Sequence, residues 1–160
     1  MKRVLTMALT AAVIIPFTAR AQTKPDFSGT WTMDAAKSDP APQGRGGGGG
    51  GGGTLTIKQS ATELSITSEG RQGPQTLTYK LDGSPSTNQM MGRGGPTEAK
   101  STAKWDGPKL VIETTRDFQG MSRTTKDTRS LSADGKEMTV ESATTTPQGE
   151  QKRKVVYTKS

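Results

Sequence analysis

Short runs in which every second residue is apolar make up much of this chain. In an extended strand such alternation places the apolar side chains on one face and the polar side chains on the other. Glu63–Ser68 is an example, with Leu64 and Ile66 on the same face. Asp-Gly pairs at 82–83, 106–107 and 134–135 each end an alternating run. Because Asp-Gly suits the positive φ of a tight hairpin turn, the pattern predicts antiparallel strands joined in sequence order.

The predicted fold class is all-β, an up-and-down meander of about eight to ten antiparallel strands, closed or nearly closed into a barrel. A β-sandwich is the alternative, since a sequence does not show closure. The only helical feature is a single turn at Asp34–Ser38, which Asp34 caps. The predicted strands lie in or around Phe27–Met33, Thr54–Gln59, Glu63–Ser68, Leu77–Leu81, Ala99–Trp105, Leu110–Ile112, Met121–Leu131, Met138–Val140 and Val155–Tyr157.

The first 21 residues have the pattern of an export signal. Lys2 and Arg3 precede an apolar run from Val4 to Phe17, and Ala19-Arg20-Ala21 is a small-x-small cleavage site. The run is too short for a permanent membrane span. We therefore expect cleavage after Ala21 and a periplasmic or secreted protein. Because no cysteine follows the signal, we expect no lipid anchor.

The remaining residues, 22–160, suit a single β domain with two irregular segments. One is a Pro/Gly-rich tract at 39–53 that contains eight consecutive glycines, and we predict that it is disordered. The other is a flexible loop predicted at 83–96. Arginine beside glycine occurs in both, but the aromatic residues that accompany such repeats in nucleic-acid-binding segments are missing, so no nucleic-acid partner is expected.

The chain contains no histidine and no cysteine. This excludes Ser-His-Asp triads, Cys-His dyads and zinc sites built on histidine. We therefore predict no catalytic residue, no metal site, no cofactor and no enzymatic activity. One enzymatic hypothesis remains, a hydrolase or isomerase with carboxylate acid–base chemistry. Its candidate residues are Glu113, Asp117, Asp127 and Glu141, although their spacing specifies no pairing.

Met121–Leu131 carries the most informative charges. Its apolar ends indicate which face is inward, and Arg123, Asp127 and Arg129 share that face. A buried charge must be paired or hydrated. Two interpretations remain open: an internal ion-pair network, or a polar cavity in which arginine anchors an anionic or amphipathic ligand.

Phe27-Ser28-Gly29-Thr30-Trp31, at the head of the first predicted strand, resembles the Gly-x-Trp signature of lipocalin-like, calycin-type proteins. Pro25–Trp31 followed by Asp34–Ser38 resembles small exported bacterial proteins with a lipocalin-like domain. The resemblance implies an up-and-down barrel closed at one end by Trp31. Trp31 could instead line a ligand pocket, and we include it with Tyr79 among the candidate ligand-binding residues.

These observations predict an exported, monomeric lipocalin-like protein that binds a small hydrophobic or amphipathic ligand in its barrel. The alternative is an envelope interaction protein with a basic, Thr- and Lys-rich surface for an acidic polymer or a protein partner. Its best feature is Lys152-Arg153-Lys154. The full chain has a net charge of +7, and loss of the signal lowers it to about +4, which is too mild to decide the matter.

Overall fold

The computed structural model describes residues 24–40, 53–70, 73–92, 95–118, 120–146 and 149–160. These residues form ten antiparallel strands, which confirms the predicted all-β class. The strands are β1 (Gly29–Met33), β2 (Thr54–Gln59), β3 (Glu63–Gly70), β4 (Gly73–Lys80), β5 (Ser86–Gly92), β6 (Gly95–Asp106), β7 (Lys109–Phe118), β8 (Met121–Leu131), β9 (Glu137–Thr146) and β10 (Gly149–Lys159).

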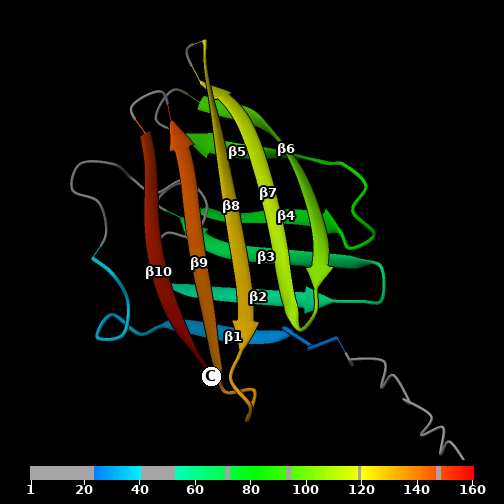
Figure 1. The fold of residues 1–160 in the computed structure, drawn as a ribbon, viewed down its shortest axis with the longest axis vertical. Coiled ribbons are helices and arrows are strands. Elements are labelled where there is room, and N and C mark those ends of the chain that lie inside the picture. The colour runs from blue at the N-terminus through cyan, green and yellow to red at the C-terminus, as the bar shows by residue number, and fades with distance from the viewer. Residues whose placement is uncertain (1–23, 41–52, 71–72, 93–94, 119, 147–148) are drawn as a thin grey trace, which may run out of the picture.

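The strands form a nearly closed up-and-down barrel. Their order is β4-β3-β2-β1-β10-β9-β8-β7-β6-β5, so every neighbouring pair except β1 and β10 is also consecutive in sequence. Figure 1 shows β6–β10 crossing in front of β1–β4, with the two sets of strands at a steep angle. The barrel is therefore flattened into two layers whose inner faces meet in the core.

The alternation in the sequence corresponds to the inner face of the barrel. Along β2, for example, Leu55 and Ile57 are buried, whereas Thr54, Thr56 and Lys58 are exposed. Aromatic and aliphatic side chains from both layers form one continuous core. The largest fully buried side chains are Trp31, Tyr157, Phe27, Leu55, Ile57, Leu64, Leu110, Ile112 and Met138.

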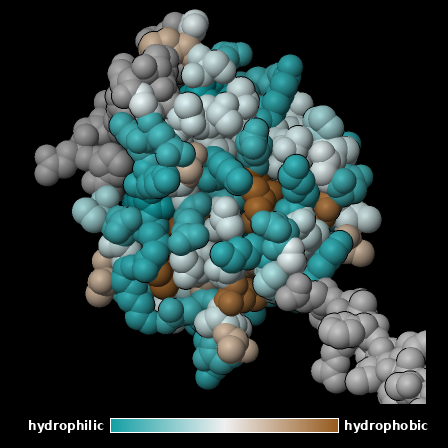
Figure 2. Space-filling view, viewed as in Figure 1, coloured by the Kyte–Doolittle hydropathy of each residue, from teal (hydrophilic) through white to brown (hydrophobic). Residues whose placement is uncertain are grey.

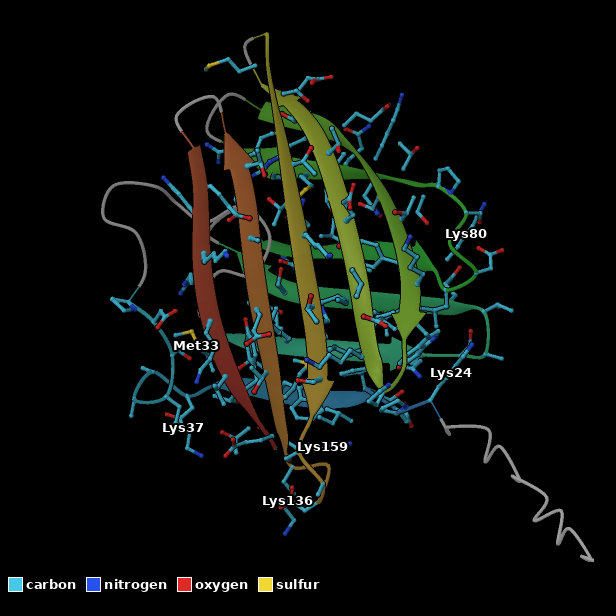
Figure 3. The ribbon with its side chains drawn as sticks, viewed as in Figure 1. Lys24, Met33, Lys37, Lys80, Lys136 and Lys159 are labelled. Carbon is cyan, nitrogen blue, oxygen red and sulfur yellow. The ribbon has the colours of Figure 1, made fainter. Side chains whose placement is uncertain are left out.

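Trp31 closes one end of the barrel, as the Gly-x-Trp resemblance implied. Its side chain has no exposed surface, and its indole Nε1 donates to the Phe27 carbonyl oxygen at 2.8 Å. Lys159 is paired with Trp31 across β1 and β10, and its Nζ lies 5.2 Å from the centre of the Trp31 ring. Figure 3 shows Lys159 at the lower end of the barrel. Gly29 has a φ of +135°, which residues with a Cβ rarely adopt, so this position favours glycine. A Cβ there would also lie 2.6 Å from Lys159 Cε, near the end of a flexible side chain.

The segment after β1 covers the part of β10 that β1 does not reach. Asp34 caps the predicted turn by accepting from the Ala36 amide. Asp34 N then donates to the Val156 carbonyl, and Ser38 Oγ accepts from Val156 N at 2.9 Å. Val156 points away from the barrel core and is nevertheless buried. An exposed strand edge is a template for unwanted pairing, and this segment removes part of it.

Side chains, and not a backbone ladder, join β4 to β5. No ladder between these two strands occurs in the described residues, although they lie side by side. Asn88 takes the place of a peptide unit: its Oδ1 accepts from Thr78 N at 2.8 Å, and its Nδ2 donates to Thr78 O at 2.9 Å. Ser86 Oγ accepts from Lys80 N, and Gln75 Nε2 donates to the Gln89 carbonyl. We call this boundary the β4–β5 seam.

The structure corrects one prediction about loops. A flexible loop was expected at 83–96, but residues 86–92 form β5 and pair with β6. The error arose because the inward side chains of β5 include Ser86 and Asn88, which bond to the backbone of β4 and so break the apolar alternation. The export signal at 1–21 and most of the tract at 39–53 lie outside the described residues.

Replacing Asn88 tests the seam. Asn88→Ala leaves both backbone groups of Thr78 without their partners, and we expect the free energy of unfolding to fall by about 2 kcal/mol. Urea unfolding measures the change, and hydrogen exchange should show faster exchange at the Thr78 amide. Thr87→Ala is the matched control, because Thr87 is exposed on the same strand. Equal losses in the two variants would contradict this account.

Candidate functional site

The two layers present different side chains to the barrel interior. A cavity of about 50 Å³ lies between them. From β2–β5 it is lined by Leu55, Ile66, Leu77, Tyr79 and Met90, which we call the apolar wall; Ser68 is the one polar residue on that side. From β7 and β8 it is lined by Thr114, Arg116, Thr125, Asp127 and Arg129, which we call the polar wall.

Arg129 is the least satisfied polar group of the polar wall. Its side chain is only 8% exposed, and its Nε and Nη1 are buried without a hydrogen-bond partner. Among the described residues it has one ion pair, from Nη2 to Asp127 Oδ2, which is long at 3.9 Å. A buried guanidinium with unused donors is costly unless an anion or water satisfies it. The prediction that Arg129 points inward beside Asp127 is thus correct.

Asp127 is shared between two neighbours. Its Oδ1 accepts a 2.6 Å hydrogen bond from Ser142 Oγ on β9, while Oδ2 faces Arg129. Two hydroxyl pairs lie on the same inner face, Ser101–Thr114 at 2.9 Å and Thr125–Thr144 at 3.1 Å. Each hydroxyl can accept more than one hydrogen bond, so these pairs keep capacity for a ligand or for water.

Positive charge on this inner face exceeds negative charge. Arg123 lies directly opposite Arg116 across β7 and β8. Burial, together with the nearby Arg123 charge, lowers the pKa of Arg116 from its usual value. Arg153 on β10 is on the same face as Val155 and Tyr157, and its Nε is also buried without a partner. In the described residues only Asp127 opposes these four arginines from the inner face of β6–β10.

Tyr79 brings a phenol from the apolar wall towards these charges. It is 6% exposed, and burial raises its pKa to about 12; the positive charge of Arg129 acts in the opposite direction and the negative charge of Asp127 adds to the rise. Burial also raises the pKa of Tyr157, again against the field of Arg129 and Arg153. Both phenols are therefore neutral at physiological pH and can act as hydrogen-bond donors.

The predicted ligand-binding residues do not all meet at the cavity. Tyr79, Asp127 and Arg129 line it, whereas Arg123 and Trp31 do not. Of the polar wall, sequence reasoning missed Thr125 on β8 and, on β7, Thr114 and Arg116. The signal was present in the alternation of β7, since both β7 residues continue the inward face of Leu110 and Ile112.

The residues of the other two hypotheses do not converge. Glu113, Asp117 and Glu141 are exposed on the outer face, so they cannot form an acid–base pair with the inward Asp127. Lys152 and Lys154 are exposed, but Arg153 between them points inward, so the three residues are not one basic patch. Figure 2 shows a mostly hydrophilic outer face with small, separate hydrophobic patches.

A larger hollow of about 340 Å³ lies outside the barrel, beside Trp105 and the β2–β3 turn. Lys24 and Asp26 border it, and Lys24 Nζ lies 5.6 Å from the centre of the Trp105 ring. Gln59 already binds the Phe27 amide and the Pro25 carbonyl, and Ser60 caps its own turn. The Trp105 indole nitrogen is also buried without a partner, but it is a single neutral donor, whereas Arg129 has two such donors and a charge. We therefore take the smaller interior cavity as the candidate site.

Within the described ranges, no group of three or more acidic side chains is placed to hold a metal ion. No helix in that part of the chain is long and apolar enough to cross a membrane.

No family model matches the chain, and no curated protein matches it. Its fold is similar to that of zebrafish ileal bile acid-binding protein, solved as a crystal structure in complex with cholic acid. The TM-score is 0.55 at 19% sequence identity, and the match covers 84% of this chain and 98% of that chain. The chain thus has a ten-stranded, nearly closed up-and-down barrel fold, which confirms the fold class predicted from the sequence.

The raised pKa of Tyr79 predicts that the folded chain becomes less stable at alkaline pH. Because its pKa is about 12 in the folded chain and 10.0 ordinarily, its contribution is complete below pH 10 and is lost as the pH rises towards 12. Each pH unit in this window lowers the free energy of unfolding by about 1.4 kcal/mol. Urea unfolding between pH 9 and 12 measures the decline. Lysines titrate in the same range, so the informative comparison is Tyr79→Phe, which should decline less steeply; identical slopes would contradict the assignment.

Proposed function

We propose that this chain is an exported, non-enzymatic binding protein that holds a small anionic amphipathic ligand between the two walls of its barrel, with Arg129 as the anchor. The observation that carries the proposal is the pair of buried, unpartnered nitrogens on Arg129 beside a cavity. An oxyanion at Nε and Nη1 would satisfy both donors with charge-assisted hydrogen bonds. The apolar wall opposite supplies the hydrophobic contact.

Binding requires the cavity to enlarge. A volume of about 50 Å³ accommodates only a few water molecules, whereas pockets for small molecules commonly span about 300–1,000 Å³. Leu77 and Tyr79 on β4 and Met90 on β5 line the cavity on either side of the β4–β5 seam. Separating these strands breaks side-chain hydrogen bonds and leaves every ladder intact. We place the expansion at this seam.

The structural comparison supports the class of ligand. Zebrafish ileal bile acid-binding protein, whose barrel is similar, was solved with cholic acid, an amphipathic carboxylate. An ion pair between Arg129 and Asp127 is compatible with ligand binding at the same site. Their 3.9 Å ion pair leaves two guanidinium nitrogens available for a ligand.

Arg129→Met tests the anchor. Dodecanoate should raise the melting temperature of the unaltered protein, and the substitution should weaken dodecanoate binding about 30-fold, because a buried charge-assisted hydrogen bond contributes about 2 kcal/mol. Without ligand, two contributions oppose one another: an apolar side chain replaces a poorly paired charge, but Asp127 Oδ2 loses its partner, so the free energy of unfolding should change by less than about 2 kcal/mol. Calorimetric titration and urea unfolding measure the two effects.

Lys126→Met is the matched control for this experiment. It removes the same charge from the same strand, but Lys126 is exposed on the outer face. It should leave the affinity for dodecanoate nearly unchanged. If both variants bind dodecanoate equally weakly, the loss reflects a general effect of charge. If Arg129→Met binds dodecanoate as tightly as the unaltered chain, the proposed site is wrong.

The amino-terminal sequence supports the exported location in the proposal. Expressed in full in a Gram-negative bacterium, the chain should be recovered from the periplasm or the medium with Gln22 as its first residue. Ala21→Arg should block cleavage, because the site requires a small side chain. Amino-terminal sequencing and cell fractionation provide the readout. An intact chain that starts at Met1 and remains in the cytoplasm would contradict export.

A further inference from the structure

The two walls of the cavity also indicate the kind of ligand, in addition to its anchor at Arg129. Hydrogen-bonding side chains of the polar wall follow two neighbouring strands, and Thr114 lies directly opposite Thr125. The facing wall offers five apolar or aromatic side chains and one serine. Polarity therefore changes across the cavity, from one layer of the barrel to the other.

A ligand with a charged head and a purely apolar chain suits this cavity poorly. Its chain would lie against Thr114 and Thr125 as well as against Leu77 and Ile66. The two threonine hydroxyls bond to Ser101 and Thr144, and such a chain would offer no partner for their remaining hydrogen-bonding capacity. Loss of hydration without a new hydrogen bond is unfavourable. A flat molecule with polar groups along one face would satisfy both walls at once.

We infer that the ligand is a facially amphipathic anion: a flat, largely apolar skeleton that carries hydroxyl or similar groups on one face and an acidic group at one end. Its polar face lies on Thr114 and Thr125, its apolar face lies on Leu55, Ile66 and Leu77, and its acidic group reaches Arg129. This inference rests on the proposed function and specifies the class of ligand for that site.

Two epimeric probes separate facial polarity from hydrophobicity and charge. Chenodeoxycholate and ursodeoxycholate have the same composition and the same carboxylate, and they differ only in which face carries the 7-hydroxyl group. In chenodeoxycholate both ring hydroxyls lie on one face. We expect it to bind about tenfold more tightly, since the epimer must bury a hydroxyl against the apolar wall. Calorimetric titration of the unaltered full chain measures both affinities.

A double variant tests whether hydroxyls of the polar wall cause the preference for chenodeoxycholate over ursodeoxycholate. Thr114→Val with Thr125→Val removes two hydroxyls at nearly constant volume and should reduce the preference to about twofold or less. Thr115→Val with Thr124→Val is the matched control, because these neighbours also lie opposite each other on β7 and β8 but on the outer face, where their hydroxyls are 3.1 Å apart. The control should keep the full preference. Urea unfolding verifies that both variants are folded.

The outcomes distinguish this inference from the proposed function. If dodecanoate and both epimers bind with similar affinity and Arg129→Met weakens all three, the proposed function stands and the facial inference is wrong. If no anionic amphiphile binds, both fail. A preference for chenodeoxycholate that persists in the Thr114, Thr125 double variant would also overturn the inference, because the polar wall would not be its origin.

Discussion

The short strand β1 holds the barrel together. In the order of hydrogen-bonded strands it lies between β2–β4 on one side and β10–β5 on the other, and it has only five residues with which to pair both neighbours. Three features of the sequence act together at this point. Gly29 leaves room for the Lys159 side chain, Lys159 covers the Trp31 ring, and the Trp31 indole is held by the Phe27 carbonyl. Through these contacts β1 joins the two layers and so brings the polar and apolar walls face to face.

Much of this architecture can be predicted from the chain alone, because a strand with one buried face determines its own alternation. Thr54–Gln59 and Met121–Leu131 were predicted with the bounds that the structure shows, and the inward positions of Asp127 and Arg129 followed from the same periodicity. β5 could not be predicted in this way. Its inward Ser86 and Asn88 are bonded to the backbone of a neighbouring strand, and that partnership exists only in the folded chain. The opposition of two unlike walls is likewise a tertiary property, which no single strand encodes.

The interior combines an ordinary hydrophobic core with a costly arrangement of charge. Arginines outnumber acids on the inner face of β6–β10, and Arg129 is left with two unused donors. A chain selected for stability alone would replace the Arg129–Asp127 pair with well-packed apolar residues. The apolar residues at the Trp31 end stabilise the fold, and the charged residues lie further along the same strands. The barrel thus separates the region that maintains the structure from the region where a ligand would be held.

The pairing of β1 with β10 also has a kinetic consequence. All other ladders join strands that follow one another in the chain, and each can form as a local hairpin. Contacts across the β1–β10 junction connect residues as far apart as Thr30 and Ser160, which are separated by 130 positions. Closing so long a loop carries a large entropic cost and slows folding. The β1–β10 ladder should therefore form last, and an open meander in which β1 and β10 each have one unpaired edge should precede the closed barrel on the folding pathway.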